Sequence, residues 1–233
     1  MVEVVDAVQR AVDGRQRLVA VGVNADVVNR AGRDADVRSA VVNADIAYAD
    51  GQSVVWAARL LGISVPERVA TTDLIWPLAQ RCAERGFGMF FYGAAPGVAA
   101  RAARRLTERF PGLRIDVADG YGSTDVVAAV NASRADVLLV GLGDPLQQRW
   151  VAQHADEIAA PAVLTCGGLF DWVSGDNRRP PEWVVRAGME WAWRLWLEPR
   201  RLFVRYVVGN PLFVLKVLRA WLTTRAPRRP VNA

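Results

Sequence analysis

The sequence predicts an α/β protein with a doubly wound, Rossmann-like and mostly parallel sheet, followed by a C-terminal helical appendage that is basic and rich in tryptophan. Three observations lead to this prediction. Short apolar runs alternate with segments of helical periodicity, which is the pattern of strands and crossover helices in a parallel sheet. Several of these runs end in glycine-containing turns that lead into a helix. The composition changes after Gly175 and a basic turn follows, so we expect an α/β domain at 1–181 and the appendage at 182–233.

The expected strands lie at residues 17–22, 44–48, 87–92, 113–117, 137–140 and 162–166. The run at 137–140 has no polar residue, as is typical of a parallel strand covered on both faces. The spacing of apolar residues predicts helices at residues 2–13, 24–42, 53–61, 72–86 and 98–110, with further helices opening at 124 and 144. At the last of these, Asp144 is expected as the N-cap and Pro145 at the first helical position.

Candidate ligand-binding residues follow the ends of two strands. In an open α/β sheet, ligands bind beyond the carboxyl ends of the strands, where helix N-termini offer free N–H groups to a phosphate. Gly143, Gln147 and Gln148 follow the run at 137–140, and the two glutamines are expected to face a bound molecule. A tight strand-to-helix turn without a ligand explains the same residues. The turn that begins at Gly93 is a second such unit and a candidate floor for a nucleotide, although such turns also occur without one.

Asp50 is the candidate catalytic residue. It follows the strand expected at 44–48 and precedes Gly51. A carboxylate there lies in the binding crevice, where it can act as a general base. On local grounds Asp50 serves equally well as the N-cap of the helix expected at 53–61, so both interpretations stay open.

Two patterns that would indicate other chemistry are weak. Asp34-Ala35-Asp36 spells the DxD with which metal-dependent glycosyltransferases hold a cation on a nucleotide sugar, but it lies on the polar side of a predicted helix. We therefore favour a solvated helix face for it. The turn 141–143 lacks the third glycine of a dinucleotide fingerprint, so an NAD-dependent oxidoreductase is poorly supported.

Few residues of this chain are suited to metal binding. Its only histidine, His154, lies within a helical pattern, and its cysteines, Cys82 and Cys166, are expected to be buried and reduced. We expect no metal site and no cofactor. We expect no signal peptide in the first residues, and no apolar stretch is long enough to predict a membrane-spanning helix.

The positive charge is concentrated near the C-terminus. From Arg186 to the end the net charge is +8, against +5 for the whole chain, which favours a local anionic partner rather than a generally cationic protein. We expect no nucleic-acid partner. Tryptophans are interleaved with these arginines, and both residue types are typical of a surface that binds anionic lipid. We therefore favour an appendage that lies on an anionic membrane surface. The alternative is a helical subdomain whose tryptophans pack on the core.

Five segments together resemble the WecG/TagA/CpsF family of bacterial glycosyltransferases. They are NADIAYADGQSVV (43–55), ERVATTDL (67–74), FFYGAAPG (90–97), VGLGDPLQQRW (140–150) and the stretch 166–206, which includes GGLFDWVSG, RRPPEW and GMEWAWRLWLEPRRLFVRY. They span nearly the whole chain in the family's order. The resemblance implies a metal-independent, inverting enzyme like the family's N-acetylmannosaminyltransferases. Such an enzyme moves a sugar from a UDP-sugar to a polyprenyl-diphosphate-linked sugar at the cytoplasmic face of the membrane.

The resemblance also assigns roles to residues. Asp50 corresponds to the catalytic base, and Arg68 and Gln147 to pocket residues. Asn24, which follows the strand expected at residues 17–22, corresponds to a polar residue of the family pattern. The tail arginines that contact the acceptor diphosphate and the leaving group correspond to Arg194, Arg201 and Arg205.

Four positions depart from the family pattern. Gly22 replaces a threonine, Thr71 a glycine, Gln148 a glutamate and Pro180 an alanine. The first and third lie near the expected sugar pocket, so the donor sugar stays open. The alternative function is a non-catalytic subunit of a polysaccharide synthesis complex that binds a nucleotide or a lipid carrier. The sequence also leaves open whether the chain forms a homo-oligomer.

Overall fold

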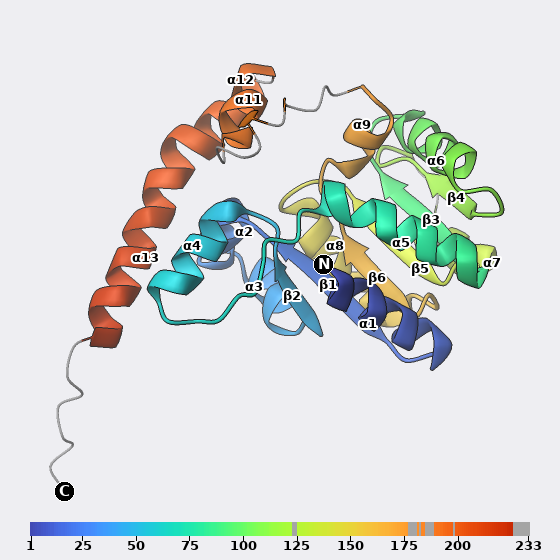
Figure 1. Cartoon of the computed structure of the whole chain (residues 1–233), viewed down its shortest axis with the longest axis horizontal. Helices are drawn as coiled ribbons and strands as arrows, with labels where there is room; N and C mark the ends of the chain where they lie inside the picture. Colours follow the sequence, from blue (N-terminus) through green and yellow to red (C-terminus); the bar gives the residue numbers. More distant parts are fainter. Residues whose placement is uncertain (123–124, 177–180, 182, 185–188, 198, 226–233) are drawn as a thin grey trace, which may run out of the picture.

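The computed structural model describes residues 1–122, 125–176, 181, 183–184, 189–197 and 199–225 (Figure 1). The described residues form the predicted α/β fold, with a six-stranded sheet between two layers of helices. Neighbouring strands all pair in parallel, in the order β2-β1-β6-β5-β3-β4. The strands are β1 (Leu18–Val23), β2 (Ile46–Ala49), β3 (Gly88–Gly93), β4 (Arg114–Ala118), β5 (Val137–Gly141) and β6 (Ala162–Thr165).

The central strands are buried because helices cover both faces of the sheet. All five residues of β5 are buried, as its continuous apolar run predicts. Successive side chains point to opposite faces, so Phe91 and Leu139 join one apolar cluster while Phe90 and Leu138 join the other. The first face is covered by α1 (Val2–Asp13), α5 (Thr71–Arg85), α6 (Val98–Arg109) and α9 (Leu169–Val173). The second is covered by α7 (Val126–Ser133) and α8 (Leu146–His154).

The prediction of one helix over residues 24–42 is wrong. The structure has α2 (Ala25–Ala31) and α3 (Ala35–Val42), with a turn between them. The break arises because Asp34 adopts an extended conformation and its carboxylate accepts hydrogen bonds from the N–H groups of Asp36 and Val37, which caps α3. A further short helix, α4 (Gln52–Leu60), follows β2.

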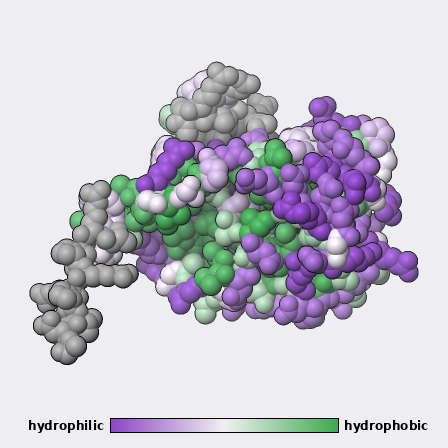
Figure 2. All heavy atoms as spheres, turned by 60° about the horizontal axis from the view of Figure 1, so that its bottom comes forward, coloured by the Kyte–Doolittle hydropathy of each residue, from purple (hydrophilic) through white to green (hydrophobic). Residues whose placement is uncertain are grey.

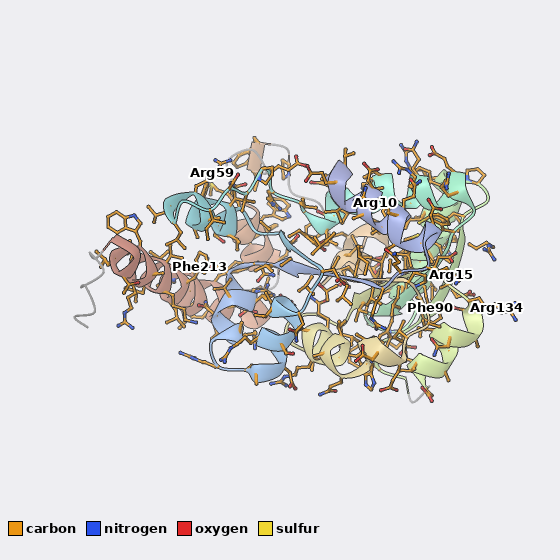
Figure 3. All side chains as sticks on the ribbon, turned by 90° about the horizontal axis from the view of Figure 1, so that it is seen from below. Arg10, Arg15, Arg59, Phe90, Arg134 and Phe213 are labelled. Carbon is orange, nitrogen blue, oxygen red and sulfur yellow. The ribbon has the colours of Figure 1, made fainter. Side chains whose placement is uncertain are left out.

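The C-terminal segment consists of helices, and the last of them packs against α2. They are α11 (Glu190–Leu197), α12 (Pro199–Phe203), the π-helix η2 (Val204–Val208) and α13 (Gly209–Arg225). The side chain of Asn29 donates a hydrogen bond to the carbonyl of Gly209 at 2.7 Å, and Lys216 Nζ donates to the carbonyl of Asn29 at 3.0 Å. Phe213 is buried on α13, at the opposite end of the molecule from Phe90 (Figure 3). Within the described ranges, no helix combines the length and the apolar character needed to cross a membrane.

Candidate active site

A cavity of about 700 Å³ lies at the carboxyl ends of β1, β2, β5 and β6. These four strands are consecutive in the sheet, and β3 and β4 lie beyond them at one edge. The loops that follow the four strands therefore converge on one crevice. The C-terminal segment closes the opposite side of the cavity through η2 and α13. Of the residues predicted from the sequence, the cavity brings together Asn24, Asp50, Arg68, Gly143, Gln147 and Arg205.

Asp50 lies at the edge of this cavity, directly after β2. Its Oδ1 accepts a hydrogen bond from the backbone N–H of Thr71 at 3.0 Å and from the Thr71 hydroxyl at 3.1 Å. Its Oδ2 accepts no hydrogen bond from the described residues. The N-cap of α4 is Gly51, so the alternative interpretation of Asp50 as a helix cap is wrong, because its carboxylate accepts hydrogen bonds from Thr71 at the start of α5. Asp50 thus lines the cavity while its Oδ1 is held by Thr71.

Arg68 and Tyr48 support Asp50 from two sides. Arg68 Nε donates to the backbone carbonyl of Asp50 at 2.8 Å. The Tyr48 hydroxyl donates to the carbonyl of Thr165 at 3.0 Å and lies 3.3 Å from the Thr71 hydroxyl oxygen. Burial, together with the charge of Asp50, raises the pKa of Tyr48 far above its ordinary value, so this hydroxyl stays protonated. Tyr48 therefore donates its hydrogen to the Thr165 carbonyl and keeps its oxygen next to the Thr71 hydroxyl.

Asp144 is the most highly bonded carboxylate of the site. Its Oδ1 accepts from the side-chain amides of Gln147 at 2.8 Å and Gln148 at 2.7 Å, and its Oδ2 from Asn24 at 3.1 Å and Arg205 at 2.9 Å. Burial would raise its pKa, but Arg205 and the three amides outweigh burial and hold the pKa below its ordinary value. Asp144 is therefore a buried carboxylate anion.

The predicted N-cap role of Asp144 is wrong. Helix α8 begins at Leu146 with Pro145 at its N-cap position, and no side chain caps it. The carboxylate of Asp144 instead joins residues from three parts of the chain. Asn24 precedes α2 and caps it by accepting from the N–H groups of Asp26 and Val27. Asn24 therefore fixes the start of α2 and, through its amide, also contacts Asp144.

Arg205 brings a positive charge from η2 into this network. Besides its bond to Asp144, its Nε lies 3.4 Å from Oδ2 of Asp26, and Asp26 also pairs with Arg30 at 3.0 Å. Burial lowers the pKa of Arg205, but the two carboxylates raise it by more, so the pKa lies above its ordinary value and the guanidinium remains charged. Arg205 is the predicted tail arginine that the structure places in the cavity.

The two glutamines differ in position. Gln147 lines the cavity, and its Oε1 accepts a hydrogen bond from the N–H of Gly167 at 2.8 Å. Gln148 is fully buried and does not line the cavity, and its Oε1 has no hydrogen-bond partner among the described residues. The structure therefore supports a contact with a bound molecule only for Gln147, whereas Gln148 orients Asp144.

The predicted glycines also differ. Gly143 lines the cavity and has a φ of +76°, which suits glycine. Gly93 does not line this cavity. An added Cβ at Gly93 would lie 2.4 Å from the backbone of Gly141 on the neighbouring strand. Close packing of β3 on β5 thus explains Gly93 without a ligand.

Two predicted tail arginines lie outside the described side chains, and the Asp34-Ala35-Asp36 pattern lies away from the cavity. The side chains of Arg194 and Arg201 lie outside the described part, although their backbones belong to α11 and α12. Asp34 pairs with Arg149 at 2.7 Å, and neither Asp34 nor Asp36 lines the cavity. Among the described residues no group of histidine, cysteine, aspartate and glutamate side chains is arranged to hold a metal ion.

Sequence reasoning missed Tyr48, Thr71 and Asp26 as site residues. Thr71 was noted only as a departure from the family pattern, yet it binds Asp50 from 21 residues away. Tyr48 is the last aromatic residue of β2 and was expected only as part of an apolar strand. A polar aromatic residue two positions before a candidate catalytic carboxylate was the available signal for Tyr48.

The fold and the cavity define an α/β enzyme that binds its ligand at the carboxyl edge of a doubly wound sheet. The model of the glycosyl transferase WecG/TagA/CpsF family matches residues 1–227, so the chain belongs to this family and is a glycosyltransferase. The family resemblance read from the sequence is confirmed.

Two curated relatives are each named N-acetylglucosaminyldiphosphoundecaprenol N-acetyl-beta-D-mannosaminyltransferase. The one from Bacillus spizizenii is 32% identical over 180 residues, which cover 76% of this chain and 69% of the relative. The one from Bacillus subtilis (strain 168) is 28% identical over 200 residues, which cover 84% of this chain and 77% of the relative.

Proposed function

We propose that this enzyme moves N-acetylmannosamine or a similar hexose from a UDP-sugar to a polyprenyl-diphosphate-linked sugar. The product would enter a cell-envelope polysaccharide or a teichoic acid. The observation that carries the proposal is Asp50, a carboxylate fixed through Oδ1 at the edge of the cavity with Oδ2 left to accept a proton. The names of the two relatives support the sugar and the class of acceptor.

In the proposed reaction, Oδ2 of Asp50 takes the proton of the acceptor hydroxyl. The hydroxyl oxygen attacks the anomeric carbon of the donor, and the bond from that carbon to the UDP oxygen breaks with its electron pair. A single displacement of this kind inverts the anomeric centre. The N-termini of α4, α5 and α8 border the cavity, and their N–H groups favour the negative charge that develops on the diphosphate.

Arginine supplies further positive charge. Arg68 is adjacent to Asp50 and lines the cavity, so we assign it to the departing diphosphate. The charge of Arg205 is already offset by Asp144 and Asp26, which makes Arg205 better suited to hold the C-terminal segment against the cavity. We propose that no metal ion takes part.

A screen of UDP-sugars tests this function directly. Each donor would be incubated with the full chain and a GlcNAc-diphosphate-prenyl acceptor, and UDP release and product mass would be measured. We expect UDP release that requires the acceptor, with UDP-N-acetylmannosamine among the best donors. Binding of UDP-sugars without turnover on any acceptor would contradict the proposal and support a non-catalytic carrier-binding subunit.

We also propose that the enzyme works at the cytoplasmic face of the membrane as a peripheral protein. On η2 and α13, apolar side chains that do not line the cavity are exposed to solvent, namely Val204, Val207, Val208, Leu215 and Leu222. The net charge of +8 after residue 185 would add attraction to anionic lipid. Sedimentation with vesicles should show binding to anionic but not zwitterionic lipid, weakened by salt.

A further inference from the structure

The cavity changes in character along its length. Its inner part, at the strand ends, is bordered by polar and charged side chains such as Asp50, Arg68 and Asp144. Its outer part runs between α4 and α13, which lie side by side in Figure 1. Here the lining side chains are apolar: Trp56, Ala57 and Leu60 from α4, and Phe213, Val214, Val217 and Leu218 from α13.

These apolar residues form one stripe on each helix. The spacing on α13 repeats every three or four residues, so its stripe faces α4 while Leu215 falls outside it. Phe213 is buried, but Trp56 is 57% exposed and Leu218 is 42% exposed. Figure 2 shows apolar residues gathered on the side of the molecule where α13 ends. We call the outer part of the cavity, between these two stripes, the apolar mouth.

An apolar surface that continues a polar cavity is suited to a ligand with both characters. A free sugar nucleotide has no apolar chain to place there, and a bilayer resting on the outside of α13 would contact Leu215 and Leu222 rather than the lining side chains. A prenyl diphosphate is a linear molecule with a charged diphosphate at one end and a hydrocarbon chain attached to it. Its diphosphate would lie toward the polar inner part of the cavity, and its chain would leave between α4 and α13.

We propose that the apolar mouth binds the first isoprene units of the acceptor lipid. The inference rests on the proposed function, since that function supplies the prenyl diphosphate. It goes further by assigning recognition of the hydrocarbon to the protein rather than to the bilayer alone. Trp56 and Leu218 are the principal contacts, because both line the mouth and both are exposed enough to be covered by a ligand.

The test measures binding without turnover. Dissociation constants would be determined by calorimetry for the full chain with isopentenyl, geranyl and farnesyl diphosphate, below the concentrations at which they aggregate. Inorganic diphosphate serves as the reference for the head group. Burial of additional hydrocarbon should lower Kd by about tenfold or more between the shortest and the longest chain.

Matched variants locate the effect. Trp56→Ala and Leu218→Ala should reduce or abolish the dependence of Kd on chain length. Leu215→Ala is the control, because Leu215 is 56% exposed on the same helix as Leu218 but does not line the mouth. A Kd that does not depend on chain length in the unmodified protein would overturn the proposal. So would an equal loss in Leu215→Ala, which would assign the apolar residues to general lipid contact.

The proposed function is judged separately by UDP release in the donor screen. Chain-length-dependent binding without any UDP release would leave the apolar mouth standing and remove the glycosyl transfer proposal. UDP release with no chain-length dependence of Kd would support glycosyl transfer and overturn the proposal for the apolar mouth. Farnesyl diphosphate that fails to bind at all would count against the apolar mouth.

Discussion

Arg205 in η2 donates a hydrogen bond to Asp144 across 61 residues of sequence, at 2.9 Å from Nη2 to Oδ2. The Asp144 side chain is only 5% exposed and the Arg205 side chain 22% exposed. This pair joins the C-terminal segment to the loop after β5, at the centre of the sheet edge. Separation of the pair would leave a buried carboxylate with only amide partners, which is costly.

Loss of the charge on Asp144 should destabilise the protein. Asp144→Asn keeps the size of the side chain but leaves Arg205 with Asp26 alone, and we expect a loss of about 2–4 kcal/mol in the free energy of unfolding. Arg205→Gln should cost a similar amount. Because each substitution removes the same interaction, the double variant should be clearly more stable than the sum of the two single effects predicts. Urea unfolding of the four proteins measures this, and additive effects would show that the pair contributes little.

The same carboxylate predicts a pH dependence. Since the folded-state pKa of Asp144 lies below its ordinary value, its stabilisation is fully present above about pH 4. The stabilisation is lost as the pH falls through the folded-state pKa, because the unfolded chain then binds the proton more readily. The difference in unfolding free energy between the unmodified protein and Asp144→Asn should therefore shrink below about pH 4. A difference that stays constant down to the acid transition would contradict an ionised Asp144.

Replacement of the proposed base should remove turnover while the fold persists. In Asp50→Asn the amide oxygen can still accept hydrogen bonds from Thr71, but the side chain can no longer take a proton. We expect kcat to fall by about a hundredfold to ten-thousandfold, with little change in the melting temperature. Asp36→Asn is the control, since Asp36 is exposed and does not line the cavity. Near-normal turnover in Asp50→Asn would remove Asp50 from the reaction.

Metal independence is a separate prediction. Activity in the UDP-release assay should persist in excess EDTA, because helix N-termini and arginine, rather than a metal ion, are proposed to stabilise the negative charge of the departing diphosphate. The Asp36→Asn variant should also keep its activity in the presence and absence of EDTA. Activity that is lost on chelation and restored by magnesium or manganese would return the Asp34-Ala35-Asp36 pattern to consideration.

Gly93 and Gly112 separate the cost of a close contact from the cost of backbone strain. Both have a positive φ, of +133° and +90°, but an added Cβ would meet the backbone of Gly141 only at Gly93 and would have open space at Gly112. We expect Gly112→Ala to cost about 1 kcal/mol and Gly93→Ala about 3 kcal/mol or more. Thermal or urea unfolding provides the comparison. Equal losses would mean that β3 and β5 separate easily.

The central strands were predictable from the sequence because burial on both faces demands continuous apolar runs, and β5 shows this at every position. The same argument placed Asp50 at the edge of the sheet. Local reasoning failed where a polar side chain that could cap the next helix instead binds residues distant in the sequence. Asp144 was suited to cap α8 but turned to Asn24 and Arg205, and Asp50 was suited to cap α4 but turned to Thr71. Such choices depend on tertiary contacts that residue type and spacing do not encode.

The lining of the cavity extends from Gly22 to Leu218. During synthesis, the strands can therefore pair well before the site has its last wall, which α13 provides. A chain translated only as far as β6 has all six strands but lacks the wall that η2 and α13 provide. Substrate binding therefore depends on residues that are translated after the sheet.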